Sequence, residues 1–141
     1  MSRQFIHLHL HSEYSLLDGM TKTKKLIKKV KEMGMDSVAL TDHGTMYGAI
    51  EFYKAAKAEG IKPIVGLEAY TTLGDHKERS GKNNHLLLLA KDEEGYKNLM
   101  QITSIAHMEG MYRKPRITRE LLANYSKGLI CTSACPAGEP G

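Results

Sequence analysis

Short apolar runs alternate along the chain with stretches whose apolar residues have helical spacing. The short apolar run at 37–41 predicts a strand buried on both faces. The run at 61–67 predicts a further strand. Apolar residues three and four positions apart predict helices over 21–33 and 45–59. The expected buried stripes are Leu26, Ile27, Val30 and Met33 in the first helix, and Met46, Ile50 and Tyr53 in the second.

The same alternation continues towards the C-terminus. Further strands are expected at 85–90 and 128–132. Asp92 is expected to cap the helix after the first of these strands, and Thr118 to cap a short helix that ends near Tyr125. Strands that alternate with helices indicate an α/β fold around a mostly parallel sheet.

Apolar residues and histidines alternate from Ile6 to His11. A β-strand here would place the apolar side chains on one face and His7, His9 and His11 on the other. Several imidazoles along one edge suit a borderline divalent metal ion, and Asp18, beyond the following turn, can add a carboxylate. The alternative is a surface strand with solvated histidines.

Residues able to bind metal also follow the later strands. His43 and Glu68 come just after the strands at 37–41 and 61–67, and Cys135 follows the last predicted strand. The carboxyl ends of parallel strands meet at one edge of a sheet. His9, His11, His43 and Glu68 are therefore expected to lie close together.

His85 does not follow this rule, because it begins its strand instead of ending it. Either that strand runs antiparallel to its neighbour, which the long polar loop at 73–84 permits, or His85 is structural. His76 within this loop is expected to be solvated. His107, late in a predicted helix, is expected to be structural.

The composition of the 141 residues is that of one globular domain, with 41% hydrophobic and 26% charged residues. Mean hydropathy is −0.39. We find no apolar run long enough for a membrane span and no secretory leader, so a cytoplasmic location without membrane association is expected. Cys131 and Cys135 are then expected to be thiols or metal ligands.

The net charge of +4 suits a polyanionic partner such as nucleic acid. Six lysines lie within 22–31, and 112–116 is basic with one tyrosine. Each segment could contact phosphates or could be an ordinary solvated surface. The chain has no tryptophan, and neither a P-loop nor a G-x-G-x-x-G nucleotide motif is present.

Five stretches, at 9–19, 40–44, 47–56, 60–70 and 88–100, resemble the PHP (polymerase and histidinol phosphatase) domain family. The similarity is to the form found at the N-terminus of bacterial DNA polymerase III alpha subunits, and it covers nearly the whole chain. It implies an α/β fold, a distorted (β/α)7 TIM-like barrel. It also implies up to three divalent metal ions, zinc or manganese, held at the strand ends.

By motif, the resemblance places the family's metal ligands on His9, His11, Asp18, His43, Glu68, His85 and Cys135. It supports His85 as a ligand and makes His7 a neighbour of the site. The family's last motif, Asp-x-His, has no counterpart before Gly141. Residues 1–141 are therefore expected to form the N-terminal portion of a PHP domain, a truncated barrel with an incomplete metal site.

The resemblance implies a parent DNA-directed DNA polymerase, a nucleotidyltransferase active in DNA replication. Its PHP site would be a metal-dependent phosphoesterase of the 3′–5′ exonuclease type, with His9, His11 and His43 as catalytic residues and the isolated fragment inactive. The expected partners are DNA, the remainder of the alpha subunit and other subunits of the replicative polymerase. One alternative is a scaffold that supports the polymerase and docks a proofreading subunit. Another is a free-standing PHP phosphatase, which the polymerase-like stretches disfavour.

Overall fold

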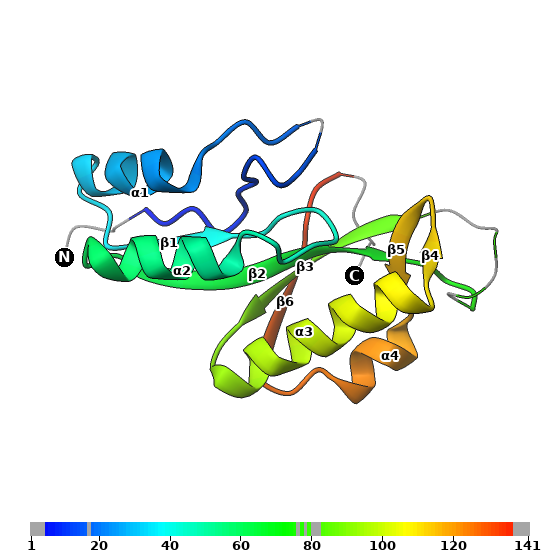
Figure 1. Cartoon of the computed structure of the whole chain (residues 1–141). Helices are drawn as coiled ribbons and strands as arrows, with labels where there is room; N and C mark the ends of the chain where they lie inside the picture. Colours follow the sequence, from blue (N-terminus) through cyan, green and yellow to red (C-terminus); the bar gives the residue numbers. More distant parts are fainter. Residues whose placement is uncertain (1–4, 17, 76, 78, 80–82, 137–141) are drawn as a thin grey trace.

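The computed structural model describes residues 5–16, 18–75, 77, 79 and 83–136, and it contains the expected alternation of strands and helices (Figure 1). The elements in chain order are α1 (Thr23–Glu32), β1 (Ser37–Leu40), α2 (Ala49–Ala58), β2 (Lys62–Thr71), β3 (Asn84–Ala90), α3 (Glu93–Met108), β4 (Met111–Tyr112), β5 (Lys114–Ile117), α4 (Arg119–Asn124) and β6 (Leu129–Ser133).

The sheet is mixed, which corrects the expectation of a mostly parallel one. Its strand order is β4-β5-β2-β3-β6, and β1 also pairs with β2. β1 and β5 run parallel to β2, whereas β3 runs antiparallel to β2 and β6 antiparallel to β3. A loop joins β2 to β3 where a parallel pair would need a crossover connection, so the chain can turn back on itself. The (β/α)7 barrel itself stays a prediction.

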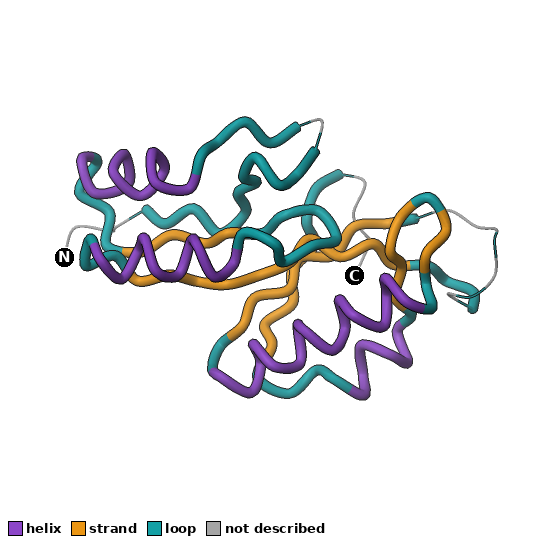
Figure 2. Tube along the Cα trace, in the orientation of Figure 1, coloured by secondary structure: helices purple, strands orange, loops and turns teal. Residues whose placement is uncertain are grey.

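Helices α2 and α3 cover the same face of the sheet, and α1 lies against α2 (Figure 2). One apolar core joins α1, β1 and α2 through Ile27, Val38 and Phe52. A second core lies between α3 and the β2–β3 pair, where Leu88 and Leu99 are fully buried. Side chains alternate along a strand, so the residues of β2 and β3 that adjoin Leu67 and Leu88 in the chain face the opposite side of the sheet, away from both helices.

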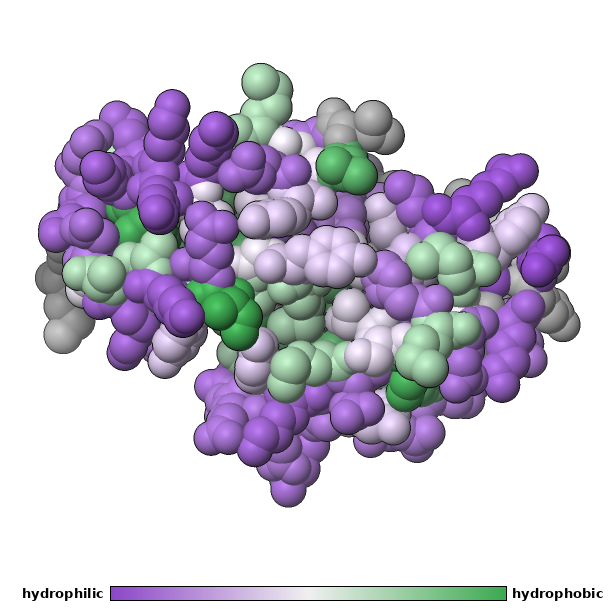
Figure 3. Space-filling view, viewed as in Figure 1, coloured by the Kyte–Doolittle hydropathy of each residue, from purple (hydrophilic) through white to green (hydrophobic). Residues whose placement is uncertain are grey.

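The buried face of α2 differs from the prediction. Ala49, Phe52 and Ala56 are buried, whereas Ile50 and Tyr53 are 58% and 49% exposed. Phe52 and Ala56 belong to the core that α2 shares with α1 and β1, and both are fully buried there. Figure 3 shows apolar side chains gathered in the hollow between α2 and α3, a cavity of about 580 Å³ lined in part by Ile50 and Tyr53.

The residue that is buried near the end of α1 also differs from the prediction. Met33 is 55% exposed, and Met35 is buried in its place. Gly34 adopts a left-handed conformation with φ of 71°, which ends the helix and redirects the chain. The predicted caps further along are confirmed: the Gly95 N–H donates to the Asp92 side chain, and the Leu121 N–H donates to Thr118.

The stretch from Ile6 to His11 is not a regular strand. It lies along β1, where the N–H groups of Ala39 and Thr41 donate to the carbonyls of His7 and Leu10. Two donors two residues apart therefore meet acceptors three residues apart. The extra residue acts like a bulge and breaks the expected alternation of faces.

None of the helices in the described ranges has both the length and the apolar character needed to span a lipid bilayer.

Candidate metal centre

A single buried carboxylate, that of Glu68, stands at the centre of four imidazoles. Glu68 is 2% exposed. Its Oε2 lies 2.6 Å from His9 Nε2, 2.8 Å from His11 Nε2 and 3.5 Å from His43 Nδ1. Its Oε1 lies 2.7 Å from His85 Nδ1. The expected convergence of His9, His11, His43 and Glu68 is therefore found in the structure.

Strand pairing explains how distant residues reach Glu68. β2 continues past Leu67, so Glu68 lies within this strand and not after its end. In the β2–β3 ladder Tyr70 is opposite His85, which puts His85 diagonally across from Glu68 on the same face. An isolated parallel bridge aligns His43 with Glu68. Because β3 is antiparallel to β2, the start of β3, which carries His85, lies at the site. This is the first of the two alternatives that the sequence left open.

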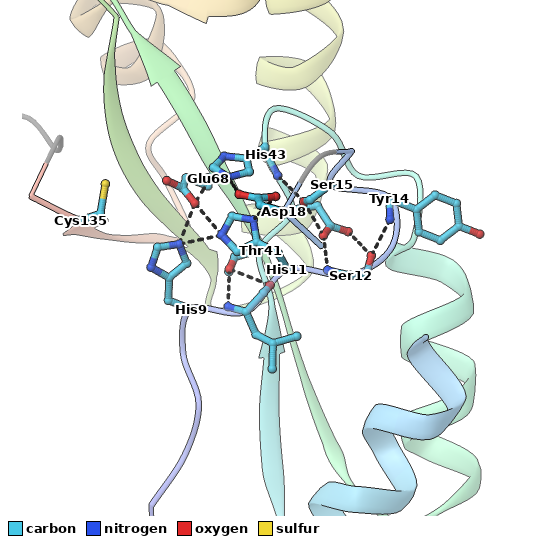
Figure 4. Close-up of polar contacts among 12 residues, drawn as sticks. His9, His11, Ser12, Tyr14, Ser15, Asp18, Thr41, His43, Glu68 and Cys135 are labelled. Atoms are coloured by element: carbon cyan, nitrogen blue, oxygen red, sulfur yellow. Dashed lines mark hydrogen bonds and ion pairs between the residues drawn. The ribbon is translucent and has the colours of Figure 1, made fainter. Parts of the chain in front are cut away.

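Asp18 lies on the outer, solvent-exposed side of the cluster. Its Oδ2 lies 2.7 Å from His43 Nε2, and its Oδ1 lies 3.9 Å from His11 Nδ1. The Asp18 side chain is 54% exposed, whereas those of His11 and His43 are 18% exposed. Figure 4 shows Asp18, His9, His11 and His43 gathered around Glu68. The cluster therefore reaches solvent on the Asp18 side.

A second buried carboxylate, Asp42, holds the loop that carries Asp18. The backbone N–H of Ser12 donates to Asp42 at 2.6 Å, and the hydroxyls of Ser12 and Ser15 donate at 2.7 and 2.8 Å. The His43 N–H donates in turn to Ser15 Oγ at 3.0 Å. This network joins the loop to the end of β1 and so sets the position of Asp18 relative to His43.

Sequence reasoning missed Asp42, Ser12 and Ser15. Asp42 immediately precedes the candidate ligand His43, and both serines lie between the candidate ligands His11 and Asp18. Nothing in this spacing indicated that the three residues hydrogen-bond to one another. Gly19, at the end of this loop, lies against the backbone of Ser12: a Cβ at Gly19 would lie 1.8 Å from the Ser12 carbonyl oxygen. Only glycine fits this close approach of two backbone segments.

The candidate ligand atoms fall into three groups, and within each group they lie within 4.8 Å of one another. These groups are His9–His11–Glu68, His11–Asp18–His43 and His43–Glu68–His85. Cys135 lies at the edge of the cluster, with its Sγ 3.5 Å from His85 Nδ1.

Two further histidines of the described ranges, His7 and His107, lie apart from these groups. The His7 ring contacts Phe5 edge-on, with ring centres 4.7 Å apart. His107 Nε2 donates a hydrogen bond to the Gly44 carbonyl at 2.8 Å, which confirms its structural role. His76, expected to be solvated, lies outside the described residues.

The charges in the cluster depend on one another. Burial disfavours the ionised Glu68 carboxylate, but hydrogen bonds with His11 and His9 outweigh it and lower the pKa of Glu68 to about 2. The hydrogen bond with Glu68 raises the pKa of His11 above its usual value of 6.5, despite partial burial. The protein thus holds an ionised carboxylate that His11 and His9 stabilise by hydrogen bonds.

The donor set fits divalent cations. Buried Nδ1 atoms of His11 and His43 have no hydrogen-bond partner among the described residues. His9 Nε2 and His11 Nε2 lie 3.0 Å apart and both face Glu68. Imidazole nitrogens and carboxylate oxygens that converge in this way are the usual ligands of zinc and manganese in proteins.

The fold and this cluster define the class: a mixed α/β domain with a candidate divalent-metal centre on the sheet face opposite its helices. The family model described as "PHP domain" matches residues 7–141, and the chain belongs to that family. The resemblance stated from the five sequence stretches is thereby confirmed.

DNA polymerase III alpha subunits are among the curated relatives of the chain. The chain is 51% identical to the one from Aquifex aeolicus over 150 residues, which cover 99% of the chain and 13% of that protein. It is 55% identical to the one from Campylobacter jejuni over 140 residues, or 96% of the chain and 12% of that protein. The chain therefore spans about an eighth of the length of these relatives.

Two solved structures share the fold. One is a candidate metal-dependent phosphoesterase from Bifidobacterium adolescentis, with a TM-score of 0.52 and 22% identity over 74% of the chain and 35% of that protein. The other is an amidohydrolase from Chromobacterium violaceum that holds sulfate and no metal. Its TM-score is 0.51, with 27% identity over 71% of the chain and 34% of that protein.

Proposed function

We propose that the chain is the N-terminal portion of a PHP domain in a DNA polymerase III alpha subunit, and that this domain hydrolyses phosphodiester bonds with bound divalent metal ions. The observation that carries the proposal is the cluster of four imidazoles around the Glu68 carboxylate, with two buried Nδ1 atoms that lack a hydrogen-bond partner among the described residues. The chain covers only about a third of the length of each solved neighbour, which supports the proposal that it is part of a larger domain.

The proposed metal ligands are those implied by the family motifs: His9, His11, Asp18, His43, Glu68, His85 and Cys135. Zinc suits the nitrogen-rich and thiolate donors, and manganese suits the carboxylates, so both are candidates. When bound, such ions lower the pKa of a coordinated water and stabilise charge that develops on a phosphate. Of these residues, His9, His11 and His43 are the proposed catalytic side chains.

The protein's own contribution is to orient these side chains and to supply charge. Glu68 stays ionised because its pKa is about 2, so it offers a permanent negative charge at neutral pH. The exposed carboxylate of Asp18 marks the open side of the cluster, by which a phosphodiester would enter. The Asp42 network keeps Asp18 beside His43 while the site is open to solvent.

In this proposal DNA is the substrate, and the remainder of the alpha subunit and other polymerase subunits are the partners. The relatives' name, DNA polymerase III subunit alpha, supports this assignment and with it a cytoplasmic location. Polymerisation would belong to other parts of the parent protein. The isolated chain is expected to be inactive in hydrolysis.

A scaffold function is the second candidate. It is favoured by the cavity of about 580 Å³ between α2 and α3, which is lined by Ile50, Tyr53 and Tyr96 on the face opposite the metal centre. Exposed apolar surface of this kind is typical of contact with another domain or subunit. A scaffold would not need an intact His and Glu cluster, so metal binding distinguishes the two candidates.

Metal binding can be measured on the 141-residue chain by isothermal titration calorimetry with zinc and manganese. Glu68→Gln keeps the shape of the side chain but removes the charge shared by two of the three ligand groups. We expect it to lose most of the metal bound by the unaltered chain. Glu120→Gln, at an exposed position of α4, removes the same charge away from the cluster and is the matched control. Equal metal binding by the two variants would contradict the proposal.

A further inference from the structure

The β4–β5 hairpin presents two cations at its tip. Tyr112 pairs with Lys114, so Arg113 alone forms the turn. Its φ of 61° is the one positive value for a non-glycine residue among the described residues. Both Arg113 and Lys114 are exposed. A bulky residue held in this unfavourable conformation indicates that the tip has a defined shape.

The hairpin lies directly beside the metal centre. Pro115 packs against Gly44, the residue after His43: a Cβ on Gly44 would lie 2.8 Å from Pro115 Cγ and 3.1 Å from the Tyr70 ring. The Lys114 ammonium lies 5.2 Å from the centre of the Tyr70 ring. That ring in turn stacks on His43 at 5.9 Å. Together these two distances place Lys114 Nζ within about 11 Å of the His43 ring centre.

Neither tip cation has a carboxylate partner among the residues that the structure describes. Other surface lysines do, as in the pairs Lys31–Glu59 and Lys97–Glu93. The Arg113 guanidinium instead lies over the Tyr112 ring, 5.4 Å from its centre. The Tyr112 ring also contacts Arg116, at 5.3 Å. Cation–π contacts with Tyr112 and Tyr70 thus hold the two tip cations in place without neutralising them.

We propose that this hairpin binds backbone phosphates of a single nucleic-acid strand whose scissile phosphodiester lies in the metal centre. The inference rests on the proposed function and adds to it the surface that binds the substrate strand beside the metal centre. Arginine donates in pairs to phosphate oxygens, and lysine adds a point charge. The 11 Å limit is short enough for Lys114 to contact a phosphate close to the scissile one on the same strand.

The test is equilibrium binding of a fluorescein-labelled oligothymidylate to the 141-residue chain, measured by fluorescence anisotropy in chelator at 25 to 200 mM NaCl. The double variant Arg113→Asn, Lys114→Gln removes both charges. Asparagine tolerates the left-handed conformation, and glutamine keeps a stem over Tyr70. The control Lys25→Ala, Lys28→Ala removes the same charge from the exposed face of α1. Far-ultraviolet circular dichroism establishes that each variant is folded.

The hairpin variant should bind about tenfold more weakly at 50 mM salt for each cation–phosphate pair that the substitutions remove. The slope of log K against log salt should become shallower by about 0.7 for each such pair. The α1 variant should retain the original slope. Equal losses of affinity in both variants, or none in the hairpin variant, would overturn the inference.

Polyglutamate serves as a second probe. An equal loss of affinity for polyglutamate in the hairpin variant would overturn the inference in favour of an acidic protein partner. Because chelator is present throughout, failure of the metal-dependent function would leave this binding result readable on its own.

Discussion

Glu68 Oε1 lies 2.7 Å from His85 Nδ1 across the antiparallel pair of β2 and β3, although the two residues are 17 positions apart in the chain. The same carboxylate meets His9 and His11 through its other oxygen. One side chain of β2 therefore links the N-terminal segment to β3. Four expected outcomes follow from this arrangement and its surroundings.

The metal-free protein should be most stable between about pH 4.5 and 6.5. The pKa of Glu68 is lowered from 4.5 to about 2, so its stabilising contribution is present above pH 4.5 and is lost as the pH falls towards 2. At about 1.4 kcal/mol per pKa unit this contribution is roughly 3 kcal/mol. The pKa of His11 is raised, so its contribution is present below pH 6.5 and is lost as the pH rises through the folded value.

Urea denaturation in chelator from pH 2 to 9 measures this profile. Glu68→Gln should flatten the acid limb, because the group that titrates there is removed. An acid limb of the same depth in this variant would show that other carboxylates cause it.

His9→Ala in a full-length parent protein should abolish metal-dependent nuclease activity and reduce the number of metal ions bound. The substitution removes a nitrogen 2.6 Å from Glu68 and 3.0 Å from His11. Polymerase activity should persist, because that chemistry is assigned to other parts of the protein. His107→Ala, which alters a histidine outside the cluster, is the control for loss of an imidazole. Unchanged nuclease activity in a folded His9→Ala protein, purified free of other nucleases, would mean that the site is structural.

Asp42→Asn should destabilise the fold by about 2–4 kcal/mol, because an amide cannot accept all three hydrogen bonds that the buried carboxylate now accepts. It should also weaken metal binding at the group that contains Asp18, since the loop loses its anchor. Urea denaturation and metal stoichiometry are the two measurements. Asp36→Asn, at an exposed position, is the control and should change the unfolding free energy by less than about 1 kcal/mol.

Gly44→Ala should cost more stability than Gly34→Ala, although both glycines adopt left-handed conformations with φ of 62° and 71°. A Cβ at Gly34 meets nothing within 4 Å, so that variant reports backbone strain alone, about 1 kcal/mol. At Gly44 the added carbon collides with Pro115 and Tyr70, which adds about 1–3 kcal/mol. Equal melting temperatures for the two variants would mean that the hairpin is not pressed against the metal centre.

Several features were readable from the sequence because their causes are local. Asp92 and Thr118 cap helices through contacts with residues three positions ahead, and Gly34 ends α1 by its own backbone conformation. The apolar run of β1 is buried at every position, as its composition indicated. The family was also recognisable, because its motifs are short continuous stretches that carry candidate ligands such as His9, His43 and Glu68.

Other features were decided only by tertiary structure, because their partners lie far away in the sequence. The rotation of α2 about its axis depends on the core that Phe52 and Ala56 share with α1 and β1, so helical spacing alone selected the wrong stripe. The extra residue beside β1 disrupts the strand expected from Ile6 to His11. His85 joins Glu68 only because β3 turns back along β2, and strand direction is set by pairing with the whole sheet, which no local pattern encodes.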